Sequence, residues 1–483
     1  MGTISSALSI ISEALDADQE ALNIVSNNVA NASTTGYTEE TSNWEENSSV
    51  TINGVSVGQG VTNTGATSVR DKVLNERRDQ QQQLASASST RLTALDSVQS
   101  LFTVASSTTT TGDIGNDITS FYNTFSKLEA TPTNTSDREA VLSAAKTLAA
   151  DISGAASSLE SQKSSQDESA AGVTSQVNAL TKSIAQLNQQ IMTTSPDSDA
   201  GTLEDQREAD VNALSKLVGI NQITTENNGL AITTTSGALL VSEGTSVDIT
   251  NGTVDGETHF FAGTTDITSG LTTGGGELGG YLTVRDTDIP SALSSLDTLA
   301  YGIETSVNAL NNAGTDADGT EGTGTNSSGT TGTGTKALYI FTQPTAVADS
   351  AANMSVVMTD SNQISAASFS EGTGGSSNAT AMYELASTTS TDLDGETPSN
   401  YYSSFVSSLG STVSEVSTES TTQTASVTQL TSEINSLSGV NLNDEASSLT
   451  TIERSYEAAS KVFTILDTVM ASVLNLGEAT TVS

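Results

Sequence analysis

The chain has 483 residues, more than one hydrophobic core normally supports, so two or more domains are expected. Aromatic residues make up only 4% of it and charged residues 15%, a composition that favours an extended molecule over a compact, enzyme-like globule. The formal net charge of -41 excludes nucleic acid and anionic membrane surfaces as partners, and the absence of Cys excludes disulfides, zinc-thiolate sites and thiol nucleophiles.

The N-terminal stretch is predicted to be an amphipathic helix that begins at Ile4 and ends within residues 27–38. Its apolar residues repeat at the two core positions of a heptad, and only Asp18 interrupts them. Two interpretations of Asp18 are open: a polar residue at the edge of the stripe, or a buried group that fixes the register of a helix pair. We expect the stripe to form an interface through Ile4, Leu8, Ile11, Leu15, Leu22, Val25 and Val29.

Residues 44–217 are predicted to be mainly helical after a short hairpin. Weak alternation of Val and Ile with interspersed Gly predicts the hairpin over residues 44–69. Heptad and amphipathic patterns then predict helices at residues 70–102, 114–129, 136–192 and 203–217. The third of these is long enough for a coiled-coil arm or a long bundle helix.

The middle of the chain is predicted to be rich in strands. From residue 221 to 283 the apolar pattern has a period of two and is broken by Asn-Gly and Gly-rich turns. One more helix is predicted over residues 289–312. The Gly/Thr/Ser-rich segment 314–335 has the composition of a flexible linker, and further strand signal follows over residues 338–369.

The C-terminal stretch is predicted to be a second heptad helix over residues 441–476, preceded by heptads over residues 409–437. Asn443 is positioned to cap the last helix, and Gly477 follows its last apolar residue, where a left-handed C-cap is expected. Because its stripe matches that of the N-terminal helix in length, we expect the two ends of the chain to pair. The predicted interface residues are Leu449, Ile452, Tyr456, Phe463, Leu466, Met470 and Val473.

Together these elements indicate an α+β multi-domain fold, with the N- and C-terminal helices paired in a coiled coil or helical bundle and β-rich domains inserted in the middle. A terminal coiled-coil domain is expected from residues 1–40 and 441–483. A helical bundle domain with a short hairpin is expected from residues 41–220, 286–312 and 401–440. A β-rich outer domain is expected from residues 221–285 and 313–400.

Two motifs beside the terminal helices resemble a known family. The first helix ends in an Asn-rich box that closes with Gly36-Tyr37, and the last helix is preceded by Ser438-Gly439-Val440-Asn441-Leu442. Both are similar to stretches of the flagellar axial proteins, the family of rod, hook and hook-associated proteins, and the second is most similar to the hook-associated members. The sequence departs from the family's pattern at Glu39-Glu40. The motif residues are Asn27, Asn28, Asn31, Gly36, Tyr37, Gly439, Val440, Asn441 and Leu442.

The resemblance implies a structural subunit of the bacterial flagellum, outside the cell at the junction between hook and filament. It implies export through the flagellar type III apparatus, self-assembly into a ring, and contacts with the hook protein and the next hook-associated protein. It also implies a cytoplasmic export chaperone, for which Leu449, Phe463 and Leu466 are candidate binding residues. A rod or hook protein of the same family, and a secreted adhesin or glycan-binding protein that uses the β-rich domain, are the alternatives.

The sequence predicts no enzyme, cofactor or metal site. Asp316, Asp318 and Glu321 begin like a calcium loop, but the downstream bidentate Glu is missing, which favours a solvated acidic linker. His259, the only His, has no indicated partner for general-base chemistry. The sequence contains neither a run long and apolar enough to span a bilayer nor the features of a cleaved signal, so membrane insertion is not expected.

Overall fold

The structure is a computed structural model that describes residues 2–52, 55–102, 113–195 and 198–478. It consists of two compact units, here called the terminal unit and the central unit. The terminal unit comprises Met1–Leu84, Thr174–Gly276 and Gln423–Ser483, and the central unit comprises Ala85–Val173 and Glu277–Thr422. Three long helices contribute many residues to both units: α2 (Lys72–Ser100), α4 (Thr135–Thr194) and α11 (Pro398–Ser438).

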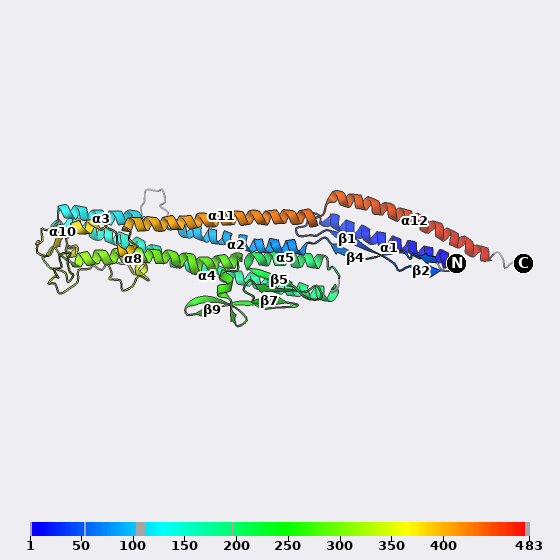
Figure 1. The fold of residues 1–483 in the computed structure, drawn as a ribbon, viewed down its shortest axis with the longest axis horizontal. Coiled ribbons are helices and arrows are strands. Elements are labelled where there is room, and N and C mark those ends of the chain that lie inside the picture. Colours follow the sequence, from blue (N-terminus) through cyan, green and yellow to red (C-terminus); the bar gives the residue numbers. More distant parts are fainter. Residues whose placement is uncertain (1, 53–54, 103–112, 196–197, 479–483) are drawn as a thin grey trace. The chain divides into compact units, whose positions relative to one another are not determined.

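In the terminal unit the two ends of the chain lie side by side, as α1 (Gly2–Asn31) and α12 (Leu442–Glu478) (Figure 1). This pairing confirms the fold class predicted from the two heptad patterns. The other side of α1 is covered by a hairpin of β1 (Glu40–Glu46) and β4 (Val61–Ser68), which pair antiparallel. A second, smaller hairpin pairs β2 (Val50–Ile52) with β3 (Val55–Val57).

The same unit contains two antiparallel sheets that follow α5 (Thr202–Leu217). The alternation in burial along β6 is that of a strand with one face on the core. Asn188 of α4 holds the first sheet, because its side-chain amide donates to the carbonyls of Leu230 and Glu243. The strand order of the first sheet is β5 (Ile220–Thr224), β6 (Leu230–Thr234), β7 (Leu239–Ser242) and β8 (Thr245–Ser246). The strand order of the second sheet is β11 (Thr265–Asp266), β10 (Glu257–Ala262) and β9 (Ile249–Val254), and α6 (Thr268–Thr272) follows this sheet along the chain.

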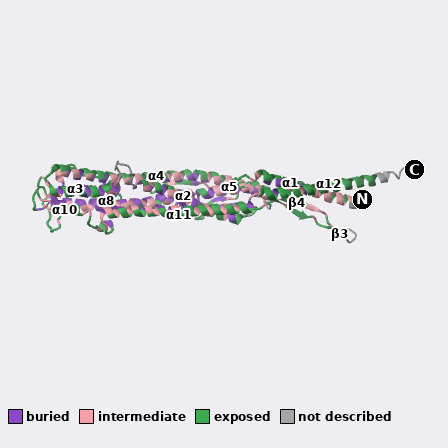
Figure 2. Ribbon diagram, turned by 90° about the horizontal axis from the view of Figure 1, so that it is seen from above, coloured by how far each residue is buried: buried purple, intermediate pink, exposed green. Residues whose placement is uncertain are grey.

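The central unit is built on a helical core. Buried residues gather along α3 (Ile114–Ala130) and α8 (Ile289–Asn312), as Figure 2 shows. Phe121 lies at its centre, with ring centroids 5.4 Å from Phe125 and 5.6 Å from Phe341 in edge-on arrangements. The remaining regular elements are α7 (Gly276–Thr283), the π-helical turn at Val284–Asp288, α9 (Ser350–Asn353), α10 (Ser377–Glu384), and short 3-10 turns at Ser361–Gln363 and Thr391–Leu393.

The segment predicted as a flexible linker is instead two stacked hairpins, so that prediction is wrong. Its sequence is a tandem ten-residue repeat, GTDADGTEGT followed by GTNSSGTTGT. In the first hairpin the Asp316 carboxylate accepts the backbone N–H groups of Asp318 and Thr320, and in the second Asn326 does the same for Ser328 and Thr330. The small residues that suggested flexibility serve close stacking, because a Cβ at residue 332 would overlap the backbone of residue 322.

The strand signal over residues 338–369 gives almost no regular sheet. Here β12 (Gly314–Thr315) and β13 (Ala367–Ser368) form a two-residue antiparallel pair, and the other pairing within this described segment is an isolated bridge between Phe341 and Val356. Side-chain amides of α8 satisfy the main chain in place of a neighbouring strand. Asn308 accepts from the N–H groups of Ile340 and Phe341, and Asn311 donates to the carbonyl of Leu338.

Both predicted caps of the last helix are wrong. Asn441 caps α12, since its side-chain oxygen accepts the backbone N–H of Asn443 at 3.1 Å, whereas Asn443 lies inside the first turn. Gly477 lies within α12, which ends at Glu478. Asp18 is buried at 2% exposure and its Oδ2 has no hydrogen-bond partner among the described residues, so its interpretation as a residue at the edge of the stripe is wrong. Its role in fixing the register of the helix pair stays a prediction.

Candidate functional site

A buried asparagine joins the two ends of the chain. The Asn28 side chain donates to Glu445 Oε1 and to the carbonyl of Glu40, both at 2.8 Å. Its oxygen accepts the Tyr37 hydroxyl at 2.8 Å and the backbone N–H of Glu40 at 3.0 Å. All four hydrogen bonds that an asparagine can make here are therefore satisfied. We call Asn28, Tyr37, Glu40 and Glu445 the asparagine clasp.

The clasp fixes where the chain enters and leaves the terminal helix pair. Tyr37 and Glu40 belong to the segment that follows α1, and Glu445 lies in the first turn of α12, where negative charge is favourable at a helix N-terminus. A backbone hydrogen bond from Glu39 N–H to the carbonyl of Ser438 joins the two segments beside the clasp at 2.9 Å. The clasp and this bond thus set the mutual register of α1 and α12 at their shared end.

The clasp is an acidic environment. Burial raises the pKa of Tyr37 to about 12, with further contributions from the carboxylates of Glu40, Asp205 and Glu445. Burial and the nearby Glu445 also raise the pKa of Glu39. Tyr37 therefore stays protonated across the physiological range and can donate its hydroxyl proton to Asn28 throughout it.

A second polar network ties the clasp segment to α5. Thr38 donates to Asp205 through its hydroxyl at 2.8 Å and through its backbone N–H at 3.1 Å. Arg70 lies between acidic partners and bonds to Asp205 at 2.6 Å and to Glu204 at 2.5 Å, with only 5% of its side chain exposed. Arg78 bridges Asp79 and Glu208 in the same way, at 2.7 Å each.

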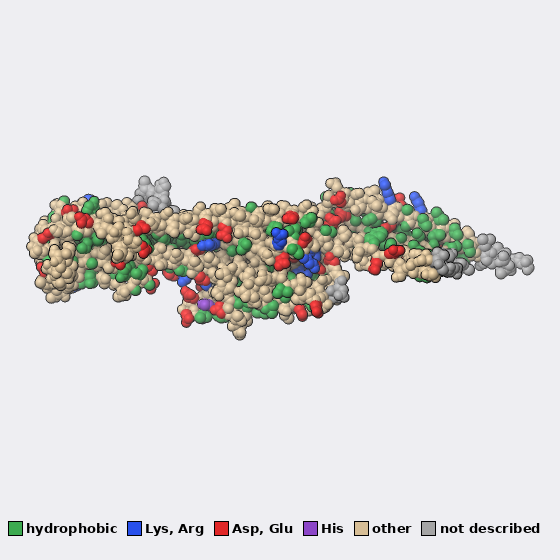
Figure 3. Space-filling model, in the orientation of Figure 1, with side chains coloured by type: hydrophobic (Ala, Val, Ile, Leu, Met, Phe, Trp, Pro, Cys, Tyr) green, Lys and Arg blue, Asp and Glu red, His purple; other side chains and the backbone are tan. Residues whose placement is uncertain are grey.

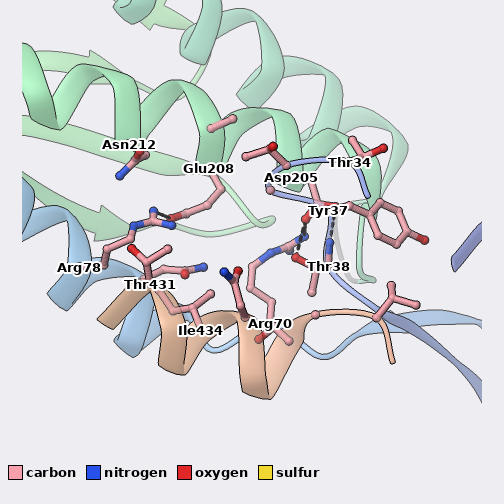
Figure 4. Close-up of a pocket in the computed structure, with 18 of the residues that line it drawn as sticks. Thr34, Tyr37, Thr38, Arg70, Arg78, Asp205, Glu208, Asn212, Thr431 and Ile434 are labelled. Atoms are coloured by element: carbon pink, nitrogen blue, oxygen red, sulfur yellow. Dashed lines mark hydrogen bonds and ion pairs between the residues drawn. The ribbon is translucent and has the colours of Figure 1, made fainter. Parts of the chain in front are cut away.

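These segments enclose a pocket of about 650 Å³ within the terminal unit. Figure 4 shows α5 on one side of it and α11 on the other, with Arg70 and Arg78 extending between them toward Asp205 and Glu208. Burial and the neighbouring Asp79 raise the pKa of Glu208, and Arg78 opposes this rise. The wall is formed by the loop 32–38, the turn 438–440, and side chains of α2, α5 and α11.

The structure explains the roles of most motif residues. Asn27 accepts a hydrogen bond from Asn31 across the last turn of α1, so these two close the helix, and only Asn28 reaches the clasp. Gly36 has a φ of +82°, which a residue with a side chain adopts only under strain, and it lines the pocket with Gly439 and Val440. The motif residues at the last helix are Asn441, its cap, and Leu442, which is 55% exposed.

Two residues of the clasp were not identified from the sequence. Glu445 looks like an ordinary helix-start carboxylate, and its partner Asn28 lies 417 residues away. Glu40 takes part through its backbone alone, which accounts for a departure from the family's pattern at Glu39-Glu40 without loss of the contact. The Asn-rich box was the available signal, but it does not reveal which of its asparagines is buried.

The predicted interface residues of both helices lie along the helix pair, most of them half-buried. On α1, Val25 is buried, Val29 is 44% exposed, and the other predicted residues are half-buried, while the most buried apolar residues described are the small Ala17 and Ala21. On α12, Tyr456 and Val473 are 37% and 39% exposed. The half-buried residues of the α12 set are Leu449, Ile452, Phe463, Leu466 and Met470.

A further apolar stripe on α12 is not part of the predicted set, apart from Val473. It consists of Val462, Ile465, Val469 and Val473, whose exposed fractions are 42%, 61%, 42% and 39%. These residues recur every three or four positions and so share one face of the helix. Figure 3 shows hydrophobic side chains gathered over the terminal helices. We call these four residues the outer stripe.

The described residues contain no group of three or more His, Asp or Glu placed to hold a metal ion. Asp316 turns its carboxylate toward backbone N–H groups, and His259 on β10 contacts Asp266 at 2.6 Å on an exposed surface. Within the described ranges, no helix is long and apolar enough to cross a membrane.

Known proteins resemble this chain along most of its length. The family model for the helical domain of flagellar hook-associated protein FlgK matches residues 95–326. Models for the flagella basal body rod protein and for the C-terminal part of the flagellar basal body rod FlgEFG proteins match residues 8–38 and 432–476.

Full-length relatives and a solved structure agree with the family models. The chain is 24% identical to flagellar hook-associated protein 1 of Escherichia coli K12, over 98% of this chain and all of that protein. It is 24% identical to the protein of the same name from Bacillus subtilis 168, over 96% of each. The structure of the flagellar hook junction protein FlgK from Burkholderia pseudomallei has a similar fold, with a TM-score of 0.62 over 74% of this chain and 99% of that one at 17% identity.

Proposed function

We propose, from its similarity to flagellar hook-associated protein 1 in sequence and fold, that the chain is a structural protein of the hook-filament junction and that it assembles there through the outer stripe of α12. The stripe carries the proposal because it is the apolar face that the contact with α1 leaves exposed. Burying the exposed halves of four aliphatic side chains contributes about 1 kcal/mol each.

Charge supports a second copy of this chain as the neighbour. Arg454 and Lys461 are the only basic residues of α12, both are exposed, and neither has an ion-pair partner among the described residues. By helical position both lie beside the outer stripe, on the same side of it. In contrast, α1 has no basic residue and carries Glu13, Asp16 and Glu20 in addition to the buried Asp18. The acidic α1 of an adjacent copy is a suitable partner for the two cations, consistent with self-assembly into a ring.

The remaining partners and the route of export are part of the same proposal. The protein is exported through the flagellar type III apparatus and reaches its place outside the cell between the hook protein and the next hook-associated protein. A cytoplasmic chaperone holds α12 before export through Leu449, Phe463 and Leu466. Because these side chains are half-covered by α1 in the folded chain, the chaperone has to bind before α1 and α12 pair.

Deletion of the gene in its host tests the junction function. The expected result is bare hooks by electron microscopy, with monomeric flagellin in the culture supernatant. Loss of the hook itself would assign the protein to the rod or hook class of the family. Normal filaments would refute a role in the flagellum and direct attention to the β-rich segments as a binding module.

A stripe variant tests the proposed interface. Ile465→Ser is expected to unfold like the natural protein as a monomer, since this side chain is 61% exposed, but to give cells that shed flagellin. Thr464→Ala, a change at an exposed position on a different face of the same helix, is the control. Normal filaments from the Ile465→Ser strain would contradict the proposal.

A further inference from the structure

The two cations of α12 lie on the outer edge of the terminal helix pair. Each residue turns a helix by about 100°, so residues two positions apart point about 200° apart. Arg454 is exposed and follows the half-buried interface residue Ile452 by two positions. Lys461 is likewise exposed and precedes the half-buried Phe463 by two positions. Both cations therefore point away from α1, and we call this side of α12 the basic edge.

Two carboxylates lie on the outer edge of α1 in the same way. Glu20 precedes the half-buried Leu22 by two positions, is exposed, and has no ion-pair partner among the described residues. Glu13 precedes the half-buried Leu15 by two positions. Its Oε2 accepts a hydrogen bond from Asn47 at 2.9 Å, and a carboxylate can accept further bonds. We call this side of α1, which points away from α12, the acidic edge.

The asparagine clasp sets the charges of the two edges at the same height. Its 2.8 Å bond between the helices joins the last turn of α1 to the first turn of α12, so the helices run antiparallel. Counted from this bond, Arg454 lies nine positions along α12 and Glu20 eight positions along α1. Lys461 and Glu13 lie sixteen and fifteen positions from it. Each cation therefore differs in height from its carboxylate by about 1.5 Å, the rise of one helical residue.

This match of charge and height favours a second copy of this chain as the neighbour. A copy placed beside the first at the same height brings Arg454 to Glu20 and Lys461 to Glu13. Two basic edges facing each other would instead bring like charges together, which is unfavourable. The contact therefore joins two different surfaces, and such head-to-tail contacts close into rings or continue as helical filaments.

We propose that the basic edge of one copy docks on the acidic edge of the next, with Arg454 paired to Glu20 and Lys461 to Glu13. The inference rests on the proposed function, because it needs neighbouring copies at the junction, and it adds the direction and the register of their assembly. Exposed ion pairs contribute little affinity, but misplaced charges disfavour other alignments. The outer stripe beside the basic edge supplies the attraction, and the charged edges fix the alignment.

Disulfide trapping tests the register, because the chain has no natural Cys. Arg454→Cys combined with Glu20→Cys places thiols at two exposed positions, one on each edge. Oxidation of isolated flagella is expected to link the copies into dimers, trimers and longer chains, since each copy then has a thiol for the neighbour on either side. The dilute monomer is expected to give no linked species, because its two thiols point away from each other.

The matched control is Arg454→Cys combined with Glu13→Cys. These positions differ in height by about 9 Å, whereas a disulfide joins Cα atoms about 4.4–6.8 Å apart, so no links are expected. Equal linking of the control and the matched pair would overturn the register, and dimers from Arg454→Cys alone would overturn the head-to-tail direction. Absence of links from the matched pair in normal flagella would overturn the edge proposal, while shedding of flagellin by the Ile465→Ser strain would leave the junction function standing.

A zero-length cross-linker tests the second ion pair without any substitution. A carbodiimide joins an amine to a carboxylate as an amide, with loss of water, only where the two groups are in contact. Digestion and mass spectrometry of treated flagella are expected to show an amide between Lys461 of one copy and Glu13 of another. An amide between Lys461 and a different flagellar protein would overturn the assignment to a second copy.

Discussion

Removal of the Asn28 side chain is the most direct test of how the two ends of the chain are held together. Asn28→Ala removes hydrogen bonds to Tyr37, to both main-chain groups of Glu40, and to Glu445. Neutral hydrogen bonds contribute about 0.5–1.5 kcal/mol each and a bond to a charged group about 1.5–3 kcal/mol. Since Asn28 is 1% exposed and Glu445 5% exposed, water replaces little of this, and a loss of about 3–5 kcal/mol is expected.

The matched control is Asn27→Ala. Asn27 is the preceding residue of the same motif, but it is exposed and its side-chain hydrogen bond stays within α1, so a loss below about 1 kcal/mol is expected. Urea unfolding followed by the fluorescence of Trp44 measures both, because this single Trp lies on the hairpin that follows the clasp segment. Equal losses for the two variants would refute the assignment of the clasp to Asn28.

A double-mutant cycle separates the charged bond from the neutral ones. Glu445→Gln keeps an acceptor oxygen for Asn28 but removes the charge, so its cost alone is expected to be smaller than that of Asn28→Ala. In the Asn28→Ala background the same change is expected to be stabilising, since it removes a buried carboxylate without a partner. Additive effects of the two substitutions would show that the pair does not interact.

Three further outcomes are expected. Burial raises the pKa of Glu304 to about 7 from an ordinary 4.5. Protonated Glu304 therefore stabilises the fold by about 3 kcal/mol below pH 4.5, and this stabilisation is lost as the pH rises through 7. Glu304→Gln keeps the acceptor for Thr342 and should flatten this pH dependence in urea titrations at about pH 4.5–8. Gly332→Ala should lower the free energy of unfolding by about 1–3 kcal/mol, because the added Cβ meets the carbonyl of Gly322. Gly374→Ala should have little effect, because Gly374 has open space around it, and equal effects of the two variants would contradict the stacked hairpins. Raising the salt concentration from about 0.1 M to about 1 M shortens the electrostatic screening length from about 10 Å to about 3 Å. Because this weakens the self-repulsion of a chain with a net charge of -41, the urea midpoint of unfolding should rise with NaCl, and a falling midpoint would contradict this.

The helices could be predicted because their signals are local and periodic. The expected helices at residues 136–192 and 203–217 correspond to α4 and α5 within two residues at each end. The pairing of α1 with α12 followed from two apolar stripes of equal length, since each needs a partner. The α12 cap was misplaced because Asn441 and Asn443 both suit a helix start, and only backbone geometry distinguishes them.

Features that depend on distant contacts could not be predicted. The composition of residues 314–335 matches a flexible linker, yet the same Gly and Thr residues stack when Asx side chains close the turns. The segment 338–369 has strand propensity, but the amides of Asn308 and Asn311 take the backbone groups that a second strand would need. The clasp depends on a contact across 417 residues, which a single sequence does not reveal.

The tandem hairpins show how a chain of this kind can change in size without disturbing its frame. Each hairpin starts and ends on the same kind of contact, since Gly322 N–H bonds to the carbonyl of Gly314 and Gly332 N–H to that of Gly324. Asp and Asn are equivalent at the turn because only one side-chain oxygen is used. A third copy of the ten-residue unit inserted after residue 333 would begin where the second ends and could stack on it in the same way. The outward-facing surface of this segment can therefore grow in steps of ten residues while the terminal helices keep their pairing.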